Sequence, residues 1–282
     1  VDLLVLRDDA AVLFKNMRDG SFRDVAEELG LAAPGPLLCA AAGDLSKDGY
    51  TDFFLGGAQS SWWALSDGRG AFTVSPAPAA VAGARAAVFL DYDNDGVLDL
   101  LAVTDRGPRL LRNLGTAWTD VTGEAFGDSA AELAGSALAS GDIDGDGDVD
   151  VLLAGEKGLV LLTNQGGNRN RSVAVRLTGR VSSRTGVGAK VEIRAGSLRQ
   201  KNETSAAVPM AAPADVIFGL GPRQAPDAVR VIWVSGIVQT EIEGMAAEAS
   251  ARRLDLAVHE LDRKPSSCPY LYAWNGERFA FV

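Results

Sequence analysis

The stretch from residue 142 to residue 155 reads DIDGDGDVDVLLAG, an acidic loop that runs directly into an apolar segment. Its first nine residues follow the pattern D-x-[DS]-x-D-G-x-x-D, which recurs at residues 44–52 and 91–99. These three windows hold 12 of the 37 acidic residues, so the negative charge of the chain is concentrated in them. Carboxylates at this density repel one another unless a cation lies between them. The pattern therefore predicts metal-binding loops.

Calcium is the ion that this pattern favours, because it takes about six to eight hard oxygen ligands, whereas magnesium retains several of its waters. Side chains at positions 1, 3, 5 and 9 and the backbone carbonyl at position 7 would supply the oxygens, and glycine at position 6 permits the sharp turn. We predict two to three calcium ions. The predicted ligands are Asp44, Ser46, Asp48, Tyr50 and Asp52 in the first loop, Asp91, Asp93, Asp95, Val97 and Asp99 in the second, and Asp142, Asp144, Asp146, Asp148 and Asp150 in the third.

Two other interpretations fit part of this pattern. An EF-hand begins with the same spacing, but it requires a glutamate at position 12 and flanking helices. Position 12 holds Leu55, Ala102 and Leu153, and each loop is followed by a short apolar run typical of a strand. The second interpretation, that the windows are only Asp- and Gly-rich turns, stays open, above all for the first loop, where Ser46 replaces an aspartate.

The loops recur at a regular period, with 47 residues from Asp44 to Asp91 and 51 from Asp91 to Asp142. Asp2, which precedes an apolar run, matches the ninth position of an earlier copy. A period near fifty is typical of a propeller, and each unit contains segments for four short strands. We expect the recurring aromatic residues to pack between blades, although one of the adjacent Trp62 and Trp63 would then face outward.

A second region begins after Asn164 and contains alternating apolar and charged residues separated by glycine turns. This alternation is typical of strands with one solvated face, and it predicts a small β-sandwich or barrel. The fold class is therefore all-β: a partial β-propeller of four-stranded blades with calcium loops, followed by this smaller domain. The predicted boundaries are 1–165 for the blades, 166–243 for the second domain, and 244–282 for a linker and the start of a further, truncated β segment.

Composition excludes several functions. The chain of 282 residues carries a net charge of −10, which disfavours a nucleic-acid partner. The single histidine, His259, and the distant Cys39 and Cys268 leave no material for a histidine-rich zinc site or a Ser-His-Asp triad in the body of the fold. No apolar stretch is long enough to span a bilayer, so we expect no membrane insertion within this fragment. Since the first residue is Val1, we expect the sequence to be part of a longer protein.

Taken together, the acidic loops, the Phe14–Leu31 repeat segment and the later strings GVGAKV, FGLG and VIWVSG resemble a known arrangement. It is that of FG-GAP/VCBS-repeat proteins with a C-terminal ASPIC/UnbV domain, the cartilage acidic protein-like group. The resemblance implies an integrin-α-like calcium-binding propeller on a secreted, cell-surface or periplasmic protein. It implies that the calcium ligands are the matching loop positions given above. Ser46 and the stretch Asn202–Pro213 depart from the family pattern.

These observations favour a non-enzymatic calcium-binding module for binding or adhesion, with a protein or glycan as partner and no catalytic residues. One alternative is a passive scaffold within a larger exported protein. Another is the propeller part of a hydrolase or lyase, which fold alone does not exclude. No paired acid and base with a recognisable spacing occurs outside the acidic loops, so the sequence argues against the enzyme.

Overall fold

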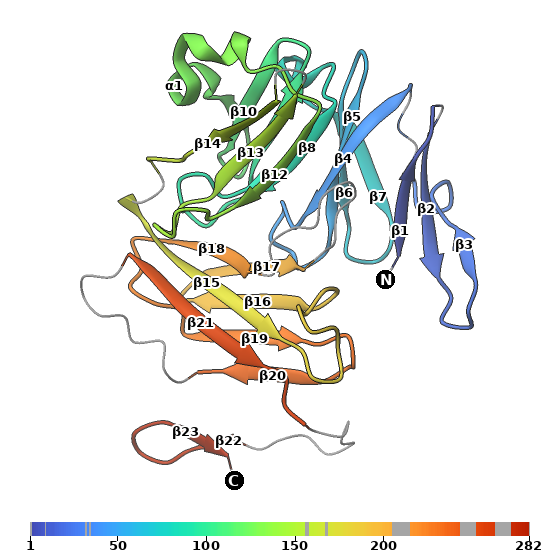
Figure 1. Cartoon of the computed structure of the whole chain (residues 1–282). Coiled ribbons are helices and arrows are strands. Elements are labelled where there is room, and N and C mark those ends of the chain that lie inside the picture. The colour runs from blue at the N-terminus through green and yellow to red at the C-terminus, as the bar shows by residue number, and fades with distance from the viewer. Residues whose placement is uncertain are drawn as a thin grey trace.

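The structure is a computed structural model that describes residues 2–8, 10–31, 33, 35–155, 158–166, 169–204, 215–242, 252–262 and 272–281. Almost all of its regular structure is β-strand, as predicted. Four blade-like sheets form an arc, and a sandwich of two sheets lies below the arc in Figure 1, with β17 and β18 nearest to the blades.

Two of the sheets are antiparallel blades of four strands. The first consists of β4 (Leu37–Gly43), β5 (Asp52–Gly57), β6 (Trp62–Ser66) and β7 (Phe72–Pro76). The second consists of β8 (Ala86–Leu90), β9 (Asp99–Thr104), β10 (Gly107–Asn113) and β11 (Trp118–Asp120). Both match the four-stranded unit that the sequence predicts.

The sheets on either side of these blades have three strands each. One contains β1 (Leu3–Leu6), β2 (Ala11–Asn16) and β3 (Phe22–Asp24), and the other β12 (Ala137–Gly141), β13 (Asp150–Gly155) and β14 (Gly158–Leu162). Asp2 precedes β1 as Asp52 opens β5, so β1 to β3 correspond to the last three strands of a blade. Short helices occur at Ala79–Val81 (η1), Thr122–Phe126 (α1) and Gly127–Glu132 (η2). No helix in the described ranges combines the length and apolar character needed to cross a membrane.

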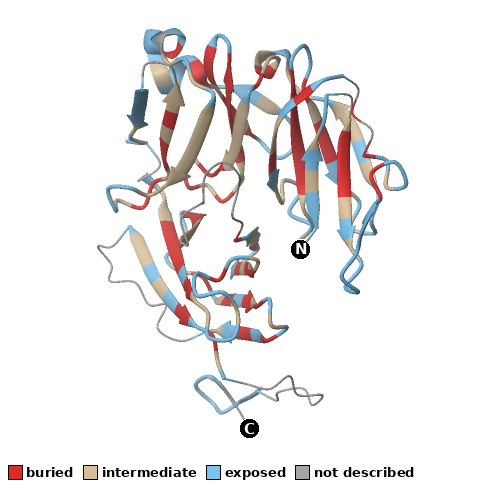
Figure 2. Ribbon diagram, turned by 45° about the vertical axis from the view of Figure 1, so that its right-hand side comes forward, coloured by how far each residue is buried: buried red, intermediate tan, exposed pale blue. Residues whose placement is uncertain are grey.

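Apolar side chains between neighbouring blades form the core of the arc. The second strand of each complete blade, β5 or β9, is buried along its whole length, which agrees with its nearly continuous apolar sequence (Figure 2). Trp63 is buried and stacks on Trp118 of the next blade, with ring centroids 4.5 Å apart. Trp62 is partly buried and packs into the cluster on the other side of its blade. The two tryptophans therefore serve two successive blade boundaries.

The sandwich contains two sheets around one apolar core, which includes the buried Val173, Phe218 and Trp233. One sheet has the order β18 (Asp215–Gly221), β15 (Arg171–Thr178), β21 (Arg253–His259). The other has the order β17 (Leu198–Glu203), β16 (Lys190–Ala195), β19 (Ala228–Ile232), β20 (Val238–Glu241). A separate hairpin of β22 (Tyr272–Trp274) and β23 (Phe279–Phe281) turns at Asn275 and Gly276, within the range where a further β segment is predicted.

Two sequence predictions are wrong: neither Trp62 nor Trp63 faces outward, and the segment 253–259 is not a linker. Residues 253–259, expected in a linker, form β21, which pairs in parallel with β15 and places His259 opposite Thr178. Leu254 and Leu256 of β21 pack against the sandwich core. The predicted boundary at residue 243, most of the stretch 202–213 and Cys268 lie outside the described residues. Cys39 is a free thiol, and burial raises its pKa to about 12.

Candidate metal centre

The three acidic loops occupy equivalent places in three successive blades. Each connects the first strand of a blade to the second: β4 to β5, β8 to β9, and β12 to β13. The loops share a left-handed backbone at positions 4 and 6. The φ angles at position 4 are 59° for Lys47, 55° for Asn94 and 82° for Gly145, and those at position 6 are 88° for Gly49, 92° for Gly96 and 97° for Gly147. Lys47 and Asn94 lie in the small left-handed region that residues with a Cβ can adopt, but the larger φ angles at position 6 lie beyond it, which explains the glycine there.

The aspartate at position 1 closes each loop by accepting a hydrogen bond from the amide of the glycine at position 6. The distances from this nitrogen to Oδ2 are 2.9 Å at Asp44, 2.8 Å at Asp91 and 2.9 Å at Asp142. The aspartate at position 5 accepts from the amide two residues later, at 2.8 Å, 2.8 Å and 2.9 Å in the three loops. The loops are therefore the same structure built three times.

The aspartate at position 9 connects its own loop to the end of the third strand of the blade. One of its oxygens accepts from the amide at position 2 of its own loop, at 2.9 Å, 3.2 Å and 2.9 Å. Its other oxygen accepts from the amide fourteen residues later, at the end of the third strand. The donors are Ser66 to Asp52, Asn113 to Asp99 and Asn164 to Asp150, all at 2.8 Å. The same bond joins Asn16 to Asp2 at 2.8 Å, as the repeat interpretation of Asp2 requires.

Two of the loops bring three carboxylates together at metal-binding distances. Asp91, Asp93 and Asp99 offer ligand oxygens that all lie within 4.8 Å of one another. Asp142, Asp144 and Asp146 do the same in the third loop. The first loop forms no such group among the described residues, in keeping with the serine at its position 3.

The second loop is the most deeply buried of these groups. Burial, followed by the charge of Asp95, raises the pKa of Asp91 to about 8. Burial is also the main cause that raises the pKa of Asp99 to about 8. The Oδ1 atom of Asp93 is buried and has no hydrogen-bond partner. Three crowded carboxylates, one with an orphaned oxygen, have the donor chemistry that a hard divalent cation requires.

Two arginine side chains contact carboxylates that are predicted metal ligands. Arg112 contacts Asp93 Oδ2 at 2.6 Å and Asp95 Oδ2 at 3.2 Å. Asp93 belongs to the three-carboxylate group despite this contact, whereas Asp95 does not belong to it. In the third loop, Arg253 Nη1 lies 2.5 Å from Asp142 Oδ2.

Three other predicted ligands stand apart from the two groups. Asp148 accepts a 2.9 Å hydrogen bond from Asn94 of the second loop, and Asp150 and Asp52 are engaged with backbone amides on both oxygens. The carbonyls of Tyr50, Val97 and Asp148 stay predicted ligands. The Tyr50 ring is half exposed and lies below the ammonium of Lys201, with Nζ 5.7 Å from the ring centroid.

Sequence reasoning missed the asparagines that end the third strands. Asn113 donates from Nδ2 to the Leu98 carbonyl at 3.1 Å within its own blade. Asn164 donates to the Tyr92 carbonyl of the preceding blade at 2.7 Å. A signal for this role was present, since asparagine stands fourteen residues after position 9 in three of four copies, Asn16 included.

Family comparisons agree with this architecture. The model of the FG-GAP-like repeat matches residues 44–102 and 91–153, and the model named ASPIC and UnbV matches residues 179–252. The chain carries FG-GAP-like repeats and an ASPIC/UnbV domain. The FG-GAP-like matches contain all three acidic loops, and the ASPIC/UnbV match falls within the sandwich. No curated protein matches the chain.

Among solved structures, the FG-GAP-like chain is similar to an Agrocybe aegerita lectin that was studied for specific recognition of non-reducing terminal N-acetylglucosamine. The match has 21% sequence identity and a TM-score of 0.42. It covers 59% of this chain and 46% of the lectin chain, so less than half of that protein is represented.

Proposed function

We propose that this protein is a calcium-stabilised binding module that acts without catalysis. The observation that carries the proposal is the convergence of three carboxylates in each of two acidic loops. The orphaned Asp93 Oδ1 adds a buried acceptor for which a cation would supply the missing partner. A bound calcium ion would neutralise the repulsion within each loop and hold the ends of two strands in place.

The proposed setting is the cell surface or the secreted space, where calcium is present at millimolar concentration. Sites of the extracellular class bind calcium with dissociation constants of about 10⁻⁴ to 10⁻³ M, so they are loaded there. Binding to the folded state alone adds stability by mass action. The rigid blades would then present a surface to a protein or glycan partner.

Calorimetric titration of calcium into the EDTA-stripped chain tests the metal part of the proposal, with magnesium as the control. We expect two to three calcium-selective sites. Heats that are absent for calcium, or equal for the two ions, would contradict it. For the partner, a glycan array probed with the full chain should show saturable binding that EDTA removes.

A second candidate, a passive scaffold, is favoured by one observation. Backbone carbonyls of the acidic loops accept hydrogen bonds from the sandwich, so this part of the loop surface is covered within the chain and is not open to an outside ligand. In that case calcium would still bind, but the glycan array and a matched protein array would show no saturable partner with or without calcium.

A further inference from the structure

The ASPIC/UnbV domain contacts all three acidic loops through their backbone carbonyls. Gly221 donates its amide to Asn94 O at 2.8 Å, and Asn170, just before β15, donates Nδ2 to Asp93 O at 2.7 Å. In the third loop, Ser172 Oγ lies 2.7 Å from the Gly147 carbonyl. In the first loop, Lys201 Nζ donates to the carbonyl of Gly49. One domain thus binds three successive blades at once.

The carbonyls used in these contacts differ from those predicted to bind the metal. The ASPIC/UnbV domain takes carbonyls at positions 3, 4 and 6 of the loops, whereas the predicted metal ligand is the carbonyl at position 7. The carbonyls that bind the ASPIC/UnbV domain are therefore not the carbonyls predicted to bind an ion, and only in the third loop does a side chain of the sandwich, Arg253, also contact a predicted carboxylate ligand, Asp142, among the described contacts. Because both interactions need the same backbone conformation, fixing the loop for one prepares it for the other.

Close packing leaves little tolerance for a change in loop shape. A Cβ on Gly96 would lie 2.9 Å from a Leu198 methyl group, and a Cβ on Gly147 would lie 2.7 Å from Ser172 Oγ. A Cβ on Gly219 of β18 would lie 2.5 Å from the Cα of Asn94 and would overlap the Asp91 carboxylate. The glycines at position 6 of the second and third loops therefore serve the interface as well as the turn, whereas a Cβ on Gly49 of the first loop would meet no atom within 4 Å.

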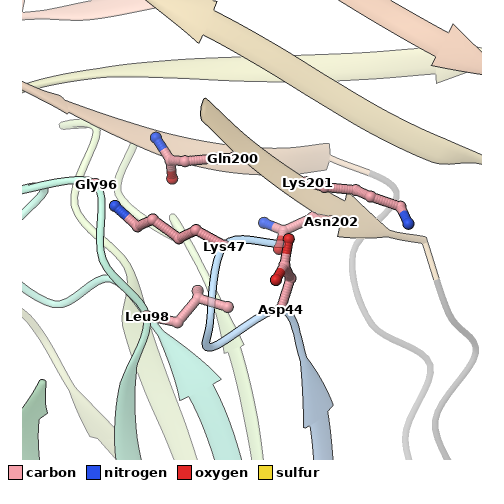
Figure 3. Close-up of a pocket in the computed structure, with 7 residues that line it drawn as sticks. All are labelled: Asp44, Lys47, Gly96, Leu98, Gln200, Lys201 and Asn202. Carbon is pink, nitrogen blue, oxygen red and sulfur yellow. The ribbon is translucent and has the colours of Figure 1, made fainter. Parts of the chain in front are cut away.

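Charge is also complementary across this interface. Arg253 of β21 contacts Asp142 at 2.5 Å, and both side chains are largely buried. In Figure 3, Asp44 and Lys47 of the first loop face Gln200, Lys201 and Asn202 of β17 across a narrow pocket. A single positive charge beside five aspartates in the third loop leaves most of the repulsion uncompensated.

We propose that calcium binding in the acidic loops and docking of the ASPIC/UnbV domain onto them strengthen each other, an inference that rests on the calcium-binding function proposed above. The domain then acts as an internal partner of the metal loops: it is held to the blades when the loops are loaded and released when they are stripped. Since binding linkage is reciprocal, calcium strengthens docking by the same factor by which docking strengthens calcium binding, so a change that undocks the domain must weaken calcium binding.

The test compares a double alanine variant with a single serine-to-alanine control in the full chain. Ser172→Ala, combined with Asn170→Ala, removes two hydrogen bonds to the loops and leaves every predicted ligand and charge in place. Ser183→Ala is the matched control, because Ser183 donates to the Val187 carbonyl within the ASPIC/UnbV domain. Two measurements are made on each protein: calcium affinity by calorimetry, and hydrogen exchange of the Gly221 amide with and without calcium.

In the wild type and in Ser183→Ala, calcium should slow exchange at Gly221 at least about tenfold more than at the core strand β19, which reports general stability. The double variant should lose this selective protection and bind calcium about fivefold to tenfold more weakly. Calcium binding without selective protection at Gly221, or wild-type affinity in the double variant, would overturn the coupling and leave the calcium site intact. If no protein binds calcium, the proposed function fails together with the coupling.

Discussion

At the scale of single residues, aspartates in one repeated pattern have different tasks. Asp93 keeps a buried oxygen without a protein partner, which suits an ion, whereas Asp52 has both oxygens occupied by backbone amides. Sequence spacing treats these positions alike as ligands. The distinction depends on which amides the strands bring to each carboxylate, and that is fixed only when the blade is formed.

Replacing Asp52 by alanine should lower the free energy of unfolding by about 2–4 kcal/mol even in EDTA, because the amides of Leu45, Ser46 and Ser66 lose their acceptor in a buried site. Urea denaturation measures the effect. Asp48→Ala, in the same loop but exposed, serves as the control and should change stability by less than about 1 kcal/mol. Equal effects of the two substitutions would show that the hydrogen bonds accepted by Asp52 do not stabilise the fold.

The buried carboxylates of the second loop predict an unusual pH dependence. Asp91 and Asp99 each have a pKa of about 8 in the folded protein, above the ordinary value of 3.8. Between pH 3.8 and about pH 8, the folded metal-free protein therefore binds more protons than the unfolded chain. Stability of the metal-free protein should therefore fall as pH rises from about 5 to about 8. Calcium displaces those protons, so the rise in melting temperature on adding calcium should be larger at pH 8 than at pH 5.5. Melting curves at both pH values, with EDTA or calcium, check both trends.

At the scale of elements, Glu260 fixes the end of β21 to the rest of the sandwich. Its Oε2 accepts from the amides of Arg180, Val181 and Ser182 at 2.7–2.8 Å, and its Oε1 accepts from the hydroxyls of Ser182 and Ser235 at 2.9 Å and 2.7 Å. Burial opposes ionisation, but the hydrogen bonds from Ser235 and Ser182 prevail and lower the pKa of Glu260 to about 2. One side chain thus joins the end of this parallel strand to the backbone of residues 180–182 and to Ser235.

Glu260→Gln should destabilise the protein by about 2–4 kcal/mol at pH 7, because an amide cannot accept from all of these donors. The loss should shrink as pH falls from about 4.5 towards 2, since over that range Glu260 takes up a proton in the unfolded wild-type chain but stays ionised in the folded one, so its stabilising contribution is lost. Chemical denaturation across this pH range measures it. Asp262→Asn is the control, because the ion pair of Asp262 with Arg180 is exposed. A loss that does not vary with pH would contradict the assignment.

The elements differ in how well the sequence predicts them. The blade strands follow directly from apolar runs after each acidic loop, and the repeat fixes their order. Strand β21 follows no acidic loop and pairs with β15, which lies far from it in the sequence. Parallel strands are not joined by a tight turn, so their pairing leaves no local signal in the sequence. The contact between the acidic loops and the ASPIC/UnbV domain could not be predicted from the sequence either. The sharp turn alone already accounts for a glycine at position 6, so the glycine gives no sign of a neighbouring domain.

At the scale of the whole molecule, the metal loops should dominate the response to calcium. The third loop holds five aspartates, the second four and the first three, so we expect calcium affinity to follow that order. Asp146→Ala should remove the site in the third loop and lower the melting temperature in calcium by about 4 °C or more, with little change in EDTA. Calorimetric stoichiometry and melting curves test this together. An unchanged number of sites with an unchanged melt would show that the third loop binds no ion.

The fold class and the location of the candidate metal sites were thus available from the sequence. The assignment of individual oxygens was not, because Arg112 and Arg253 arrive from other strands to compete for them. Long-range basic side chains of this kind carry no spacing signal relative to the loops that they contact.

The stacked pair of Trp63 and Trp118 has an optical consequence. Their rings lie 4.5 Å apart with planes inclined by only 14°, and they belong to adjacent blades. Indoles this close share their excited states, so their electronic transitions couple and add a paired band to the circular dichroism spectrum. That band depends steeply on the distance between the rings. The intensity of this band therefore reports the distance between two adjacent blades without any added label, and it can be used to follow their separation in real time.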